Sequence, residues 1–303
     1  MWWFYRKGPS GFAGASTAEE VTAGTDGRGL VAVITGASSG IGRETARVLA
    51  LRGVRVVMAV RDVSAGIRAK EAIQAEIPGG AEVDVLQLDL SSMASKQRWG
   101  HDEGLHAFLR RPGAALCDES HRLLTPMAGH FLLTNLLLEN MKSASRNSGI
   151  QGRIVNVSSA GHIMTYPEGI CFDKLHDPSG FSSFIAYGQS KLANILHSNE
   201  LSRILKEEGV NISANTVHPG VIATSLFKNR TIVNALMNTV GGIISRSVEQ
   251  GAATTCYVAM HPQVQGITGG YFGNCNIAKP SSQGVDGELA KELWKFSLQI
   301  VSS

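Results

Sequence analysis

The chain has 303 residues, of which 43% are hydrophobic and 17% are charged, and its formal net charge is +3. This length suits one large α/β domain or two small ones, and the composition is typical of a globular protein with a full core. The small net charge and the lack of a Lys/Arg block argue against a nucleic-acid partner, and no apolar run is long enough for a membrane-spanning helix.

The first 27 residues are predicted to form an N-terminal extension, and residues 28–303 a single domain. The aromatic start "MWWFYRKG" is too short for the apolar core of a signal peptide. We expect it to fold onto its own domain, with a peripheral membrane contact as the alternative. In "STAEEV", Ser16 and Glu19 have capping-box spacing, which predicts a helix start.

Strands and helices then alternate along the chain. The predicted strands are apolar on both faces, and they lie at residues 30–35, 54–60, 83–88, 153–157, 211–217 and, at the end, 269–272. The predicted helices lie at residues 41–51, 65–77, 129–141, 183–208, 248–260 and 287–298. Alternation of buried strands with helices predicts an α/β fold with a doubly wound parallel sheet and helices on both of its faces.

A glycine-rich turn, "TGASSGIG" at residues 35–42, follows the first strand and opens the first helix of that sheet. Glycine permits a tight turn and lets backbone N–H groups approach a pyrophosphate, and the helix dipole favours an anion at the same place. A glycine-rich turn alone is a weak signal. Its position between a strand and a helix predicts a dinucleotide site.

The end of the second strand predicts which dinucleotide binds. An acidic residue there would bond a ribose 2′-hydroxyl, but Val60 stands at that place and Arg61 follows. A guanidinium suits a 2′-phosphate, so the sequence favours NADP(H), although Asp62 could pair with Arg61. Asp89, in "LDL" after the third strand, lies where it could meet the adenine amine.

The motif "YGQSK" places Tyr187 and Lys191 four residues apart on a predicted helix, and therefore on one face. A phenol is a poor acid or base at neutral pH, but a nearby ammonium favours its ionised form. The pair can then exchange a proton with a carbonyl or alcohol oxygen.

Together, "TGASSGIG", "NVSSAGH", "YGQSK" and "VHPGVIAT" resemble the short-chain dehydrogenase/reductase family over residues 28–92 and 129–280. The long spacer between Ser159 and Tyr187 resembles its retinol-dehydrogenase-like branch. "GFAGASTAEEV", "QGAATTCYVA" and "CNIAKP" are most similar to a plant subgroup. That subgroup includes the dehydrogenase-type (Tic) component of the chloroplast inner-envelope protein translocon.

The resemblance assigns roles residue by residue. Tyr187 resembles the catalytic acid/base, Lys191 the residue that binds the nicotinamide ribose and tunes the phenol, and Ser159, in preference to Ser158, the residue that holds the substrate oxygen. The residues that match the family's cofactor contacts, besides Tyr187 and Lys191, are Gly36, Ser38, Ser39, Gly40, Ile41, Gly42, Arg61, Asp89, Leu90, Pro219, Gly220, Val221 and Thr224.

Residues 96–128 depart from the family pattern. The family has a central strand here that ends in an Asn-Asn-Ala-Gly turn, whereas this chain has no Val or Ile between Leu90 and Ile150. The best candidate for a strand is residues 113–118, and Pro126 stands at the place of the family's proton-relay Asn. We therefore expect the fourth strand to be missing or degraded and the chain to be impaired.

Three interpretations of this segment compete. It is a frame or splice artefact in an otherwise ordinary sequence, or it is genuine and marks a non-catalytic relative. In the third, a metal binds to His101, His106, Cys117 and His121, although their spacing matches no standard zinc pattern.

Two functions follow from the resemblance. The first is an NADP(H)-dependent oxidoreductase that interconverts a carbonyl and an alcohol on an apolar substrate. Residues 225–244 are largely apolar and are either a substrate lid or a core or interface helix. The alternative is a non-catalytic, NADP(H)-responsive subunit of a chloroplast-envelope import assembly. The resemblance implies a peripheral inner-envelope location, with the cytoplasm as the alternative. The C-terminal "KELWKFSLQIV" is either a calmodulin-binding helix or a docked terminal helix.

Overall fold

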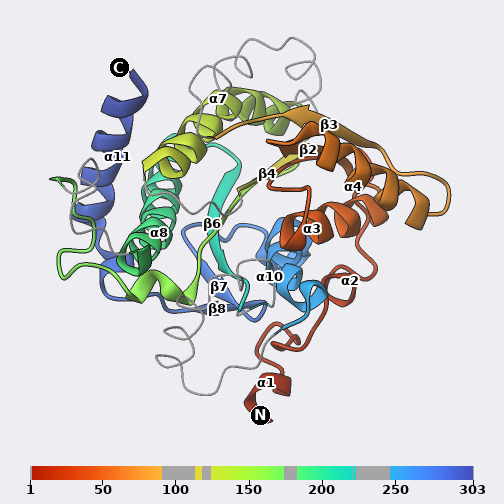
Figure 1. The fold of residues 1–303 in the computed structure, drawn as a ribbon, viewed down its shortest axis with the longest axis horizontal. Helices are drawn as coiled ribbons and strands as arrows, with labels where there is room; N and C mark the ends of the chain where they lie inside the picture. Colours follow the sequence, from red (N-terminus) through yellow and green to blue (C-terminus); the bar gives the residue numbers. More distant parts are fainter. Residues whose placement is uncertain are drawn as a thin grey trace.

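The computed structural model of the chain describes residues 2–90, 113–117, 124–173, 183–220, 222 and 246–302. One eight-stranded sheet runs through the molecule in the order β3-β2-β1-β4-β5-β6-β7-β8 (Figure 1). All neighbours are parallel except β7 and β8, which are antiparallel. The strands are β1 (Val31–Thr35), β2 (Arg55–Val60), β3 (Val83–Gln87), β4 (Gly113–Cys117), β5 (Gly152–Val157), β6 (Ile212–His218), β7 (Tyr271–Gly273) and β8 (Asn276–Ala278).

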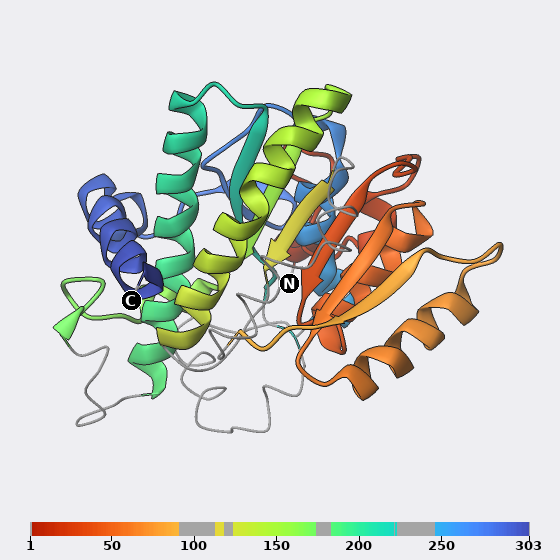
Figure 2. The ribbon, with the colours of Figure 1, turned by 90° about the horizontal axis from the view of Figure 1, so that it is seen from above.

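Helices cover both faces of this sheet (Figure 2). One face packs against α3 (Gly40–Leu51), α4 (Val63–Glu76) and α10 (Val248–Met260), and the other against α7 (Leu124–Ser148) and α8 (Ser183–Glu207), with α11 (Gly287–Ser302) outside α8. The short helices are α1 (Trp2–Tyr5), α2 (Ala18–Val21), η1 (Ala160–Ile163), η4 (Pro262–Val264) and η5 (Gln283–Val285). This is the predicted doubly wound architecture.

The strands are continuous apolar runs because the sheet is buried on both sides. Every residue of β1 is buried, and its side chains divide alternately between two core clusters. Ala32 and Ile34 pack with α3 and α10, whereas Val31 and Val33 pack with Leu133 and the other helices of the second face.

The expectation of a missing fourth strand is wrong. β4 lies between β1 and β5, and its register pairs Ala114 with both Ala32 and Arg153. Parallel pairing uses backbone N–H and C=O groups, and strand propensity is a weak preference that tertiary context overrides. The two flanking strands supply partners on both sides, so a segment without Val or Ile completes the sheet.

α7 also begins earlier than predicted, at Leu124, with Pro126 in its first turn. A proline is tolerated there because the first N–H groups of a helix have no intrahelical partner. At the site end of α7, Gly129 lies so close to the chain after β3 that an added Cβ would be 2.6 Å from the Leu90 carbonyl oxygen.

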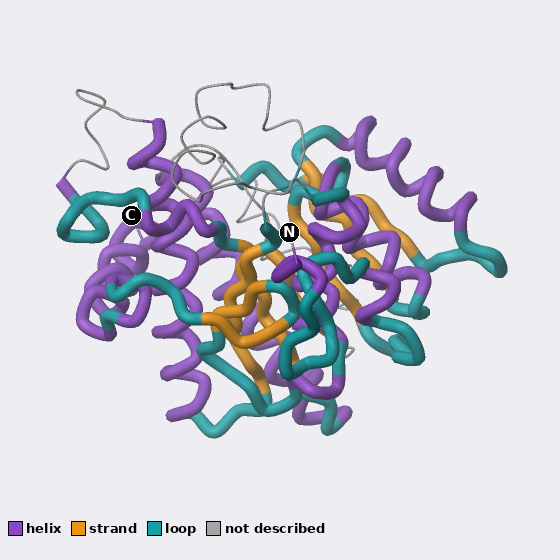
Figure 3. The backbone as a smooth tube through the Cα atoms, turned by 90° about the horizontal axis from the view of Figure 1, so that it is seen from below, coloured by secondary structure: helices purple, strands orange, loops and turns teal. Residues whose placement is uncertain are grey.

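The N-terminal extension packs on the domain, as predicted for its aromatic start. The Phe4 side chain is buried, and α1 lies in front of the sheet in Figure 3. The predicted capping box is wrong by one residue, because Thr17 and Glu20 form it around α2. The Ser16 hydroxyl instead accepts a hydrogen bond from the Ala13 N–H at 3.2 Å.

The C-terminal helix α11 is docked. Its Trp294 stacks on His197 of α8 with ring centroids 5.4 Å apart, and meets Phe131 of α7 edge-on. Across the described ranges, no helix combines the length and apolarity that a membrane crossing requires. Cys171, Cys256 and Cys275 are free thiols.

Candidate active site

The glycine-rich turn joins the carboxyl end of β1 to α3. Gly36 and Gly40 have positive φ angles of 63° and 56°, a backbone region that favours glycine. A Cβ on Gly42 would lie 2.6 Å from the Gly36 carbonyl oxygen, so only glycine lets the helix approach the turn. Ser39 is the N-cap of α3 but its hydroxyl makes no capping bond, which leaves the helix N-terminus open to an anion.

The other residues of this turn surround the same helix start. Ser39 is exposed, and Ser38 and Ile41 are partly exposed. A pyrophosphate fits here because Gly36 and Gly40 have positive φ and Gly42 packs closely on the turn, and a Cβ at any of the three would disturb this backbone. The residues present therefore fit the dinucleotide that the sequence predicts.

The second strand ends beside this turn, since β1 and β2 are parallel neighbours. Val60 is buried, whereas Arg61 is exposed and follows directly. Asp62 is the N-cap of α4, and its carboxylate accepts a bond from the Ala65 N–H at 3.0 Å. Among the ion pairs between described residues none joins Arg61 to Asp62, so the competing pairing considered from the sequence is not formed.

The third strand ends beside the second, where the residues predicted to contact adenosine lie. The Leu88 N–H donates to the Val60 carbonyl at 2.8 Å, which keeps the chain beyond β3 against the end of β2. Asp89 and Leu90 follow and are partly exposed. The predicted adenosine residues thus share one edge of the sheet with the glycine-rich turn.

The two serines after β5 have different surroundings. Ser158 is fully buried, and its hydroxyl donates to the Lys191 carbonyl at 2.7 Å, which ties β5 to α8. Ser159 caps η1, and its hydroxyl accepts a bond from the Gly161 N–H at 3.1 Å. The Ser158 hydroxyl is therefore occupied by a buried contact with α8, and Ser159 caps the turn that packs on the Tyr187 ring.

Tyr187 and Lys191 lie on one face of α8, four residues apart as predicted. The Lys191 ammonium is buried and lies 5.5 Å from the centroid of the Tyr187 ring. A Cβ on Gly161 would be 2.7 Å from the ring carbon Cε1 of Tyr187, so this ring packs directly on the chain that follows Ser159. The structure thus brings the three predicted catalytic residues together.

Two histidines beside Ser159 were missed by the sequence reasoning. His162 Nε2 accepts a bond from the Ser281 N–H at 2.9 Å, so Nδ1 carries the proton and donates to the Ser159 carbonyl at 2.7 Å. His218 Nδ1 accepts from the Ala160 N–H at 3.1 Å. The signal was present, because each histidine stands within a family motif, "NVSSAGH" or "VHPGVIAT".

Both imidazoles are held neutral. Burial lowers the pKa of His162 against the opposing effect of its bond to Ser159. Burial, followed by the charge of Arg246, lowers the pKa of His218 to about 3. These rings therefore fix the backbone around Ser159 as hydrogen-bonding groups, without adding charge at neutral pH.

The turn after β6 lies next to this cluster. Pro219 is buried, and Gly220 has a φ of 89°. Val221, Thr224 and the predicted lid at residues 225–244 lie outside the described residues, as do His101, His106 and His121 of the candidate metal site. Within the part of the chain that the structure describes, no group of three metal-ligating side chains occurs.

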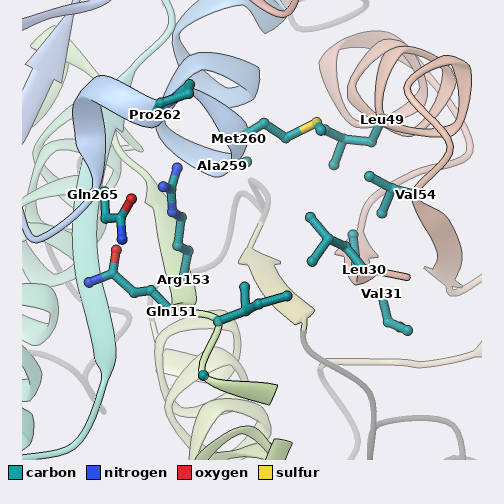
Figure 4. Close-up of a pocket in the computed structure, with 13 residues that line it drawn as sticks. Leu30, Val31, Leu49, Val54, Gln151, Arg153, Ala259, Met260, Pro262 and Gln265 are labelled. Atoms are coloured by element: carbon teal, nitrogen blue, oxygen red, sulfur yellow. The ribbon is translucent and has the colours of Figure 1, made fainter. Parts of the chain in front are cut away.

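A pocket of about 330 Å³ lies at the amino ends of the strands, opposite the candidate site (Figure 4). The start of β1, the start of β5 and the end of α10 line it, and the Arg153 side chain lies there beside Gln151 and Gln265. It contains none of the residues predicted for catalysis or cofactor binding, because those lie at the carboxyl ends of the strands.

Comparison with known proteins agrees with this geometry. A model of the short chain dehydrogenase family matches residues 30–100. The chain is 48% identical to the short-chain dehydrogenase TIC 32 B, chloroplastic, of Brassica napus, over 98% of this chain and 97% of that protein. It is 36% identical to retinol dehydrogenase 11 of Mus musculus, over 90% and 86% of the two chains. The crystal structure of an uncharacterized protein from Mycobacterium paratuberculosis has a TM-score of 0.71 and 28% identity, and the match covers 93% of this chain and 97% of that one. The chain therefore belongs to the short-chain dehydrogenase family.

Proposed function

We propose that the protein is an NADP(H)-dependent oxidoreductase that interconverts a carbonyl and an alcohol. The observation that carries this proposal is the buried Lys191 ammonium beside the Tyr187 ring, on a helix packed against the chain after Ser159. A buried cation favours the ionised phenol, which suits Tyr187 for proton transfer near neutral pH.

Each residue has a separate task in this reaction. When bound, NADP(H) supplies or accepts the hydride. The Ser159 hydroxyl holds the substrate oxygen, and Tyr187 gives a proton to that oxygen in reduction or takes it in oxidation. Lys191 stabilises the phenolate, and the Gly36–Gly42 turn with the N-terminus of α3 holds the pyrophosphate.

Arg61 supports the choice of NADP(H) over NAD(H). It is exposed at the end of β2, where the dinucleotide fold places the ribose, and Asp62 is engaged as the cap of α4. A guanidinium in this position can bind a 2′-phosphate through two charge-assisted bonds.

We also propose a chloroplast location, because the Brassica napus relative is named as chloroplastic and matches nearly the whole chain. The related alternative is a regulatory subunit of the inner envelope that binds NADP(H) without turnover. A calmodulin partner for α11 would have to displace the packing of Trp294 on His197 and Phe131. Calmodulin could therefore bind α11 only after this helix is released from the domain.

The test combines binding with turnover. NADPH binding is followed by its fluorescence, and turnover by NADPH oxidation with a panel of apolar aldehydes and ketones. Binding with turnover of any member supports the oxidoreductase, and binding with no turnover across the panel favours the regulatory subunit. Failure to bind NADPH or NADH would contradict both.

A further inference from the structure

A buried guanidinium supports the turn that borders the candidate catalytic residues. Arg246 is 7% exposed, and its Nη1 donates to the Pro219 carbonyl at 3.0 Å. Its Nη2 donates to the side-chain oxygen of Asn274. None of the ion pairs between described residues includes Arg246, and its described partners are two neutral oxygens and an aromatic ring.

That ring belongs to the N-terminal extension. The Phe4 side chain is 3% exposed, and the centroid of its ring lies 5.5 Å from Cζ of Arg246. A Cβ on Gly14 would be 2.9 Å from both the Arg246 Nη2 atom and the Phe4 ring, so the extension wraps closely around this contact. A cation over an aromatic face is stabilised by the ring quadrupole, most strongly where water is excluded.

The extension is fastened at a second point. The Asn276 side chain accepts a bond from the Ser10 N–H at 2.9 Å and donates to the Phe12 carbonyl at 3.2 Å. Asn276 begins β8, so the extension is tied to the edge of the main sheet. Phe4 is therefore held over Arg246 by an anchored segment.

On its other side, the guanidinium touches the turn itself. A Cβ on Gly220 would lie 2.4 Å from Nε of Arg246, and the Gly220 N–H donates to His218 Nδ1 at 3.4 Å. The same imidazole nitrogen accepts from the N–H of Ala160, the residue after Ser159. The turn, the histidine and the chain at Ser159 thus form one connected group above Arg246.

We propose that Phe4 and Arg246 are positioning residues for the nicotinamide end of the site. Phe4 shields and orients the guanidinium, and the guanidinium holds the Pro219 carbonyl and with it the conformation of the Pro219–Gly220 turn. This inference rests on the proposed function, because the turn matters if a nicotinamide ring lies beside it. We call the Phe4–Arg246 contact the clamp. The pyrophosphate turn and Arg61 follow other strands, so loss of the clamp should misplace the nicotinamide ring without releasing the cofactor.

The first test separates kcat from cofactor binding. Phe4→Ala should lower kcat about ten-fold while the Kd for NADPH changes less than about three-fold, since small misplacement of a reacting group costs one to two orders of magnitude. Arg246→Met should lower kcat further. The kcat of Arg246→Lys, which keeps the charge but not the planar guanidinium, should lie between those of Phe4→Ala and Arg246→Met. Ile67→Ala is the control, because Ile67 is an apolar residue of α4 that is 44% exposed.

A second readout does not depend on turnover. Hydrogen exchange of a peptide that covers residues 212–222 should be faster in Phe4→Ala than in the wild type and in Ile67→Ala, with no cofactor present. Faster exchange with no turnover in any protein would sustain the clamp and contradict the oxidoreductase. Unchanged exchange with unchanged kcat in Phe4→Ala would overturn the clamp. Equal losses of Tm, cofactor affinity and kcat in Phe4→Ala and Arg246→Lys would also overturn it, since they would show a merely structural contact.

Discussion

At the scale of single residues, the adjacent Ser158 and Ser159 differ in their hydrogen bonds. The Ser158 hydroxyl donates to the backbone of α8, the helix that carries Tyr187, whereas the Ser159 hydroxyl caps η1. Alternation along an extended chain turns successive side chains to opposite sides, so two identical residues acquire different tasks.

Tyr187→Phe should abolish turnover and leave NADPH binding nearly unchanged. In the proposed reaction the hydroxyl transfers the proton, whereas the ring packs against Gly161 and remains in the variant. Turnover and NADPH fluorescence titration should be measured on the same preparation. Activity in Tyr187→Phe equal to that of the wild type would remove Tyr187 from the mechanism.

Arg61→Ala should shrink the preference for NADPH over NADH. Loss of charge-assisted bonds to the 2′-phosphate costs about 1.5–3 kcal/mol, or roughly 10- to 150-fold in the ratio of dissociation constants. Calorimetry with both cofactors measures that ratio. Arg68→Ala is the control, since Arg68 is also exposed but lies within α4. Tight binding of NAD by the unmodified protein would contradict the assignment.

At the scale of elements, β4 shows what a strand needs in the middle of a sheet. Its backbone pairs with β1 and β5 along nearly its whole length. We expect the amide protons of residues 114–117 to exchange as slowly as those of β1 and β5. Native-state hydrogen exchange measures this directly, and fast exchange at these four amides beside a slowly exchanging β5 would show that the pairing does not persist.

The docking of α11 depends on one aromatic cluster. Trp294→Ala should destabilise the protein by about 2–3 kcal/mol, somewhat less than for a fully buried tryptophan, because Trp294 is only half-buried. Urea unfolding measures the change, and Lys295→Ala on the exposed face serves as the control. Proteolysis of α11 should become faster only in Trp294→Ala. Equal stability of the two variants would show that the cluster does not hold the helix.

The elements that sequence predicts well are those in which pattern and packing agree. The predicted bounds of α10 match the structure because a serine cap, a buried face and His261 after its last residue mark the same limits. β8 was missed, since its two-residue hairpin turn uses Asn274 and Cys275 at positive φ, and a cysteine there gives no turn signal. The capping box shifted by one residue because two Ser/Thr–Glu pairs have the same spacing, and the Ser16 hydroxyl bonds to Ala13 instead.

The candidate site was predictable where a residue acts through its own side chain. Tyr187, Lys191 and Ser159 lie together as expected. Arg246 and Phe4 were not predicted, because their importance depends on a contact between segments more than 200 residues apart in the chain. No local pattern encodes such a pairing.

At the scale of the whole molecule, two histidines with lowered pKa values should make stability depend on pH. Burial lowers the pKa of His197 from 6.5 to about 4, and the pKa of His218 is lowered to about 3. Above pH 6.5 both are neutral in the folded and unfolded chains and contribute no pH dependence. Below it, the unfolded chain binds protons that the folded chain excludes, so the free energy of unfolding falls by ~1.4 kcal/mol per pH unit for each histidine, down to its folded-state pKa.

Urea unfolding at a series of pH values between 7.5 and 4.5 measures this effect. His197→Gln should reduce the slope of the free energy of unfolding against pH by about one proton relative to the wild type. Carboxylates contribute to both proteins alike, so the difference between the two slopes reports His197. Identical slopes would mean that the His197 pKa is not lowered in the folded chain.

The central place of β4 has a consequence for how the chain assembles during synthesis. β1, β2 and β3 adjoin one another and are complete by residue 87, whereas β5, β6, β7 and β8 form a second block. In the described sheet, β4 is the strand that joins the two blocks. The block of β1, β2 and β3 can therefore fold on the ribosome before the second block is made. The proposed dinucleotide would lie across this seam, with its adenosine on the early block and its nicotinamide on the late one. A cofactor that binds only when both blocks are joined would stabilise the joined state. Newly made chains would then complete folding faster in cells rich in that cofactor.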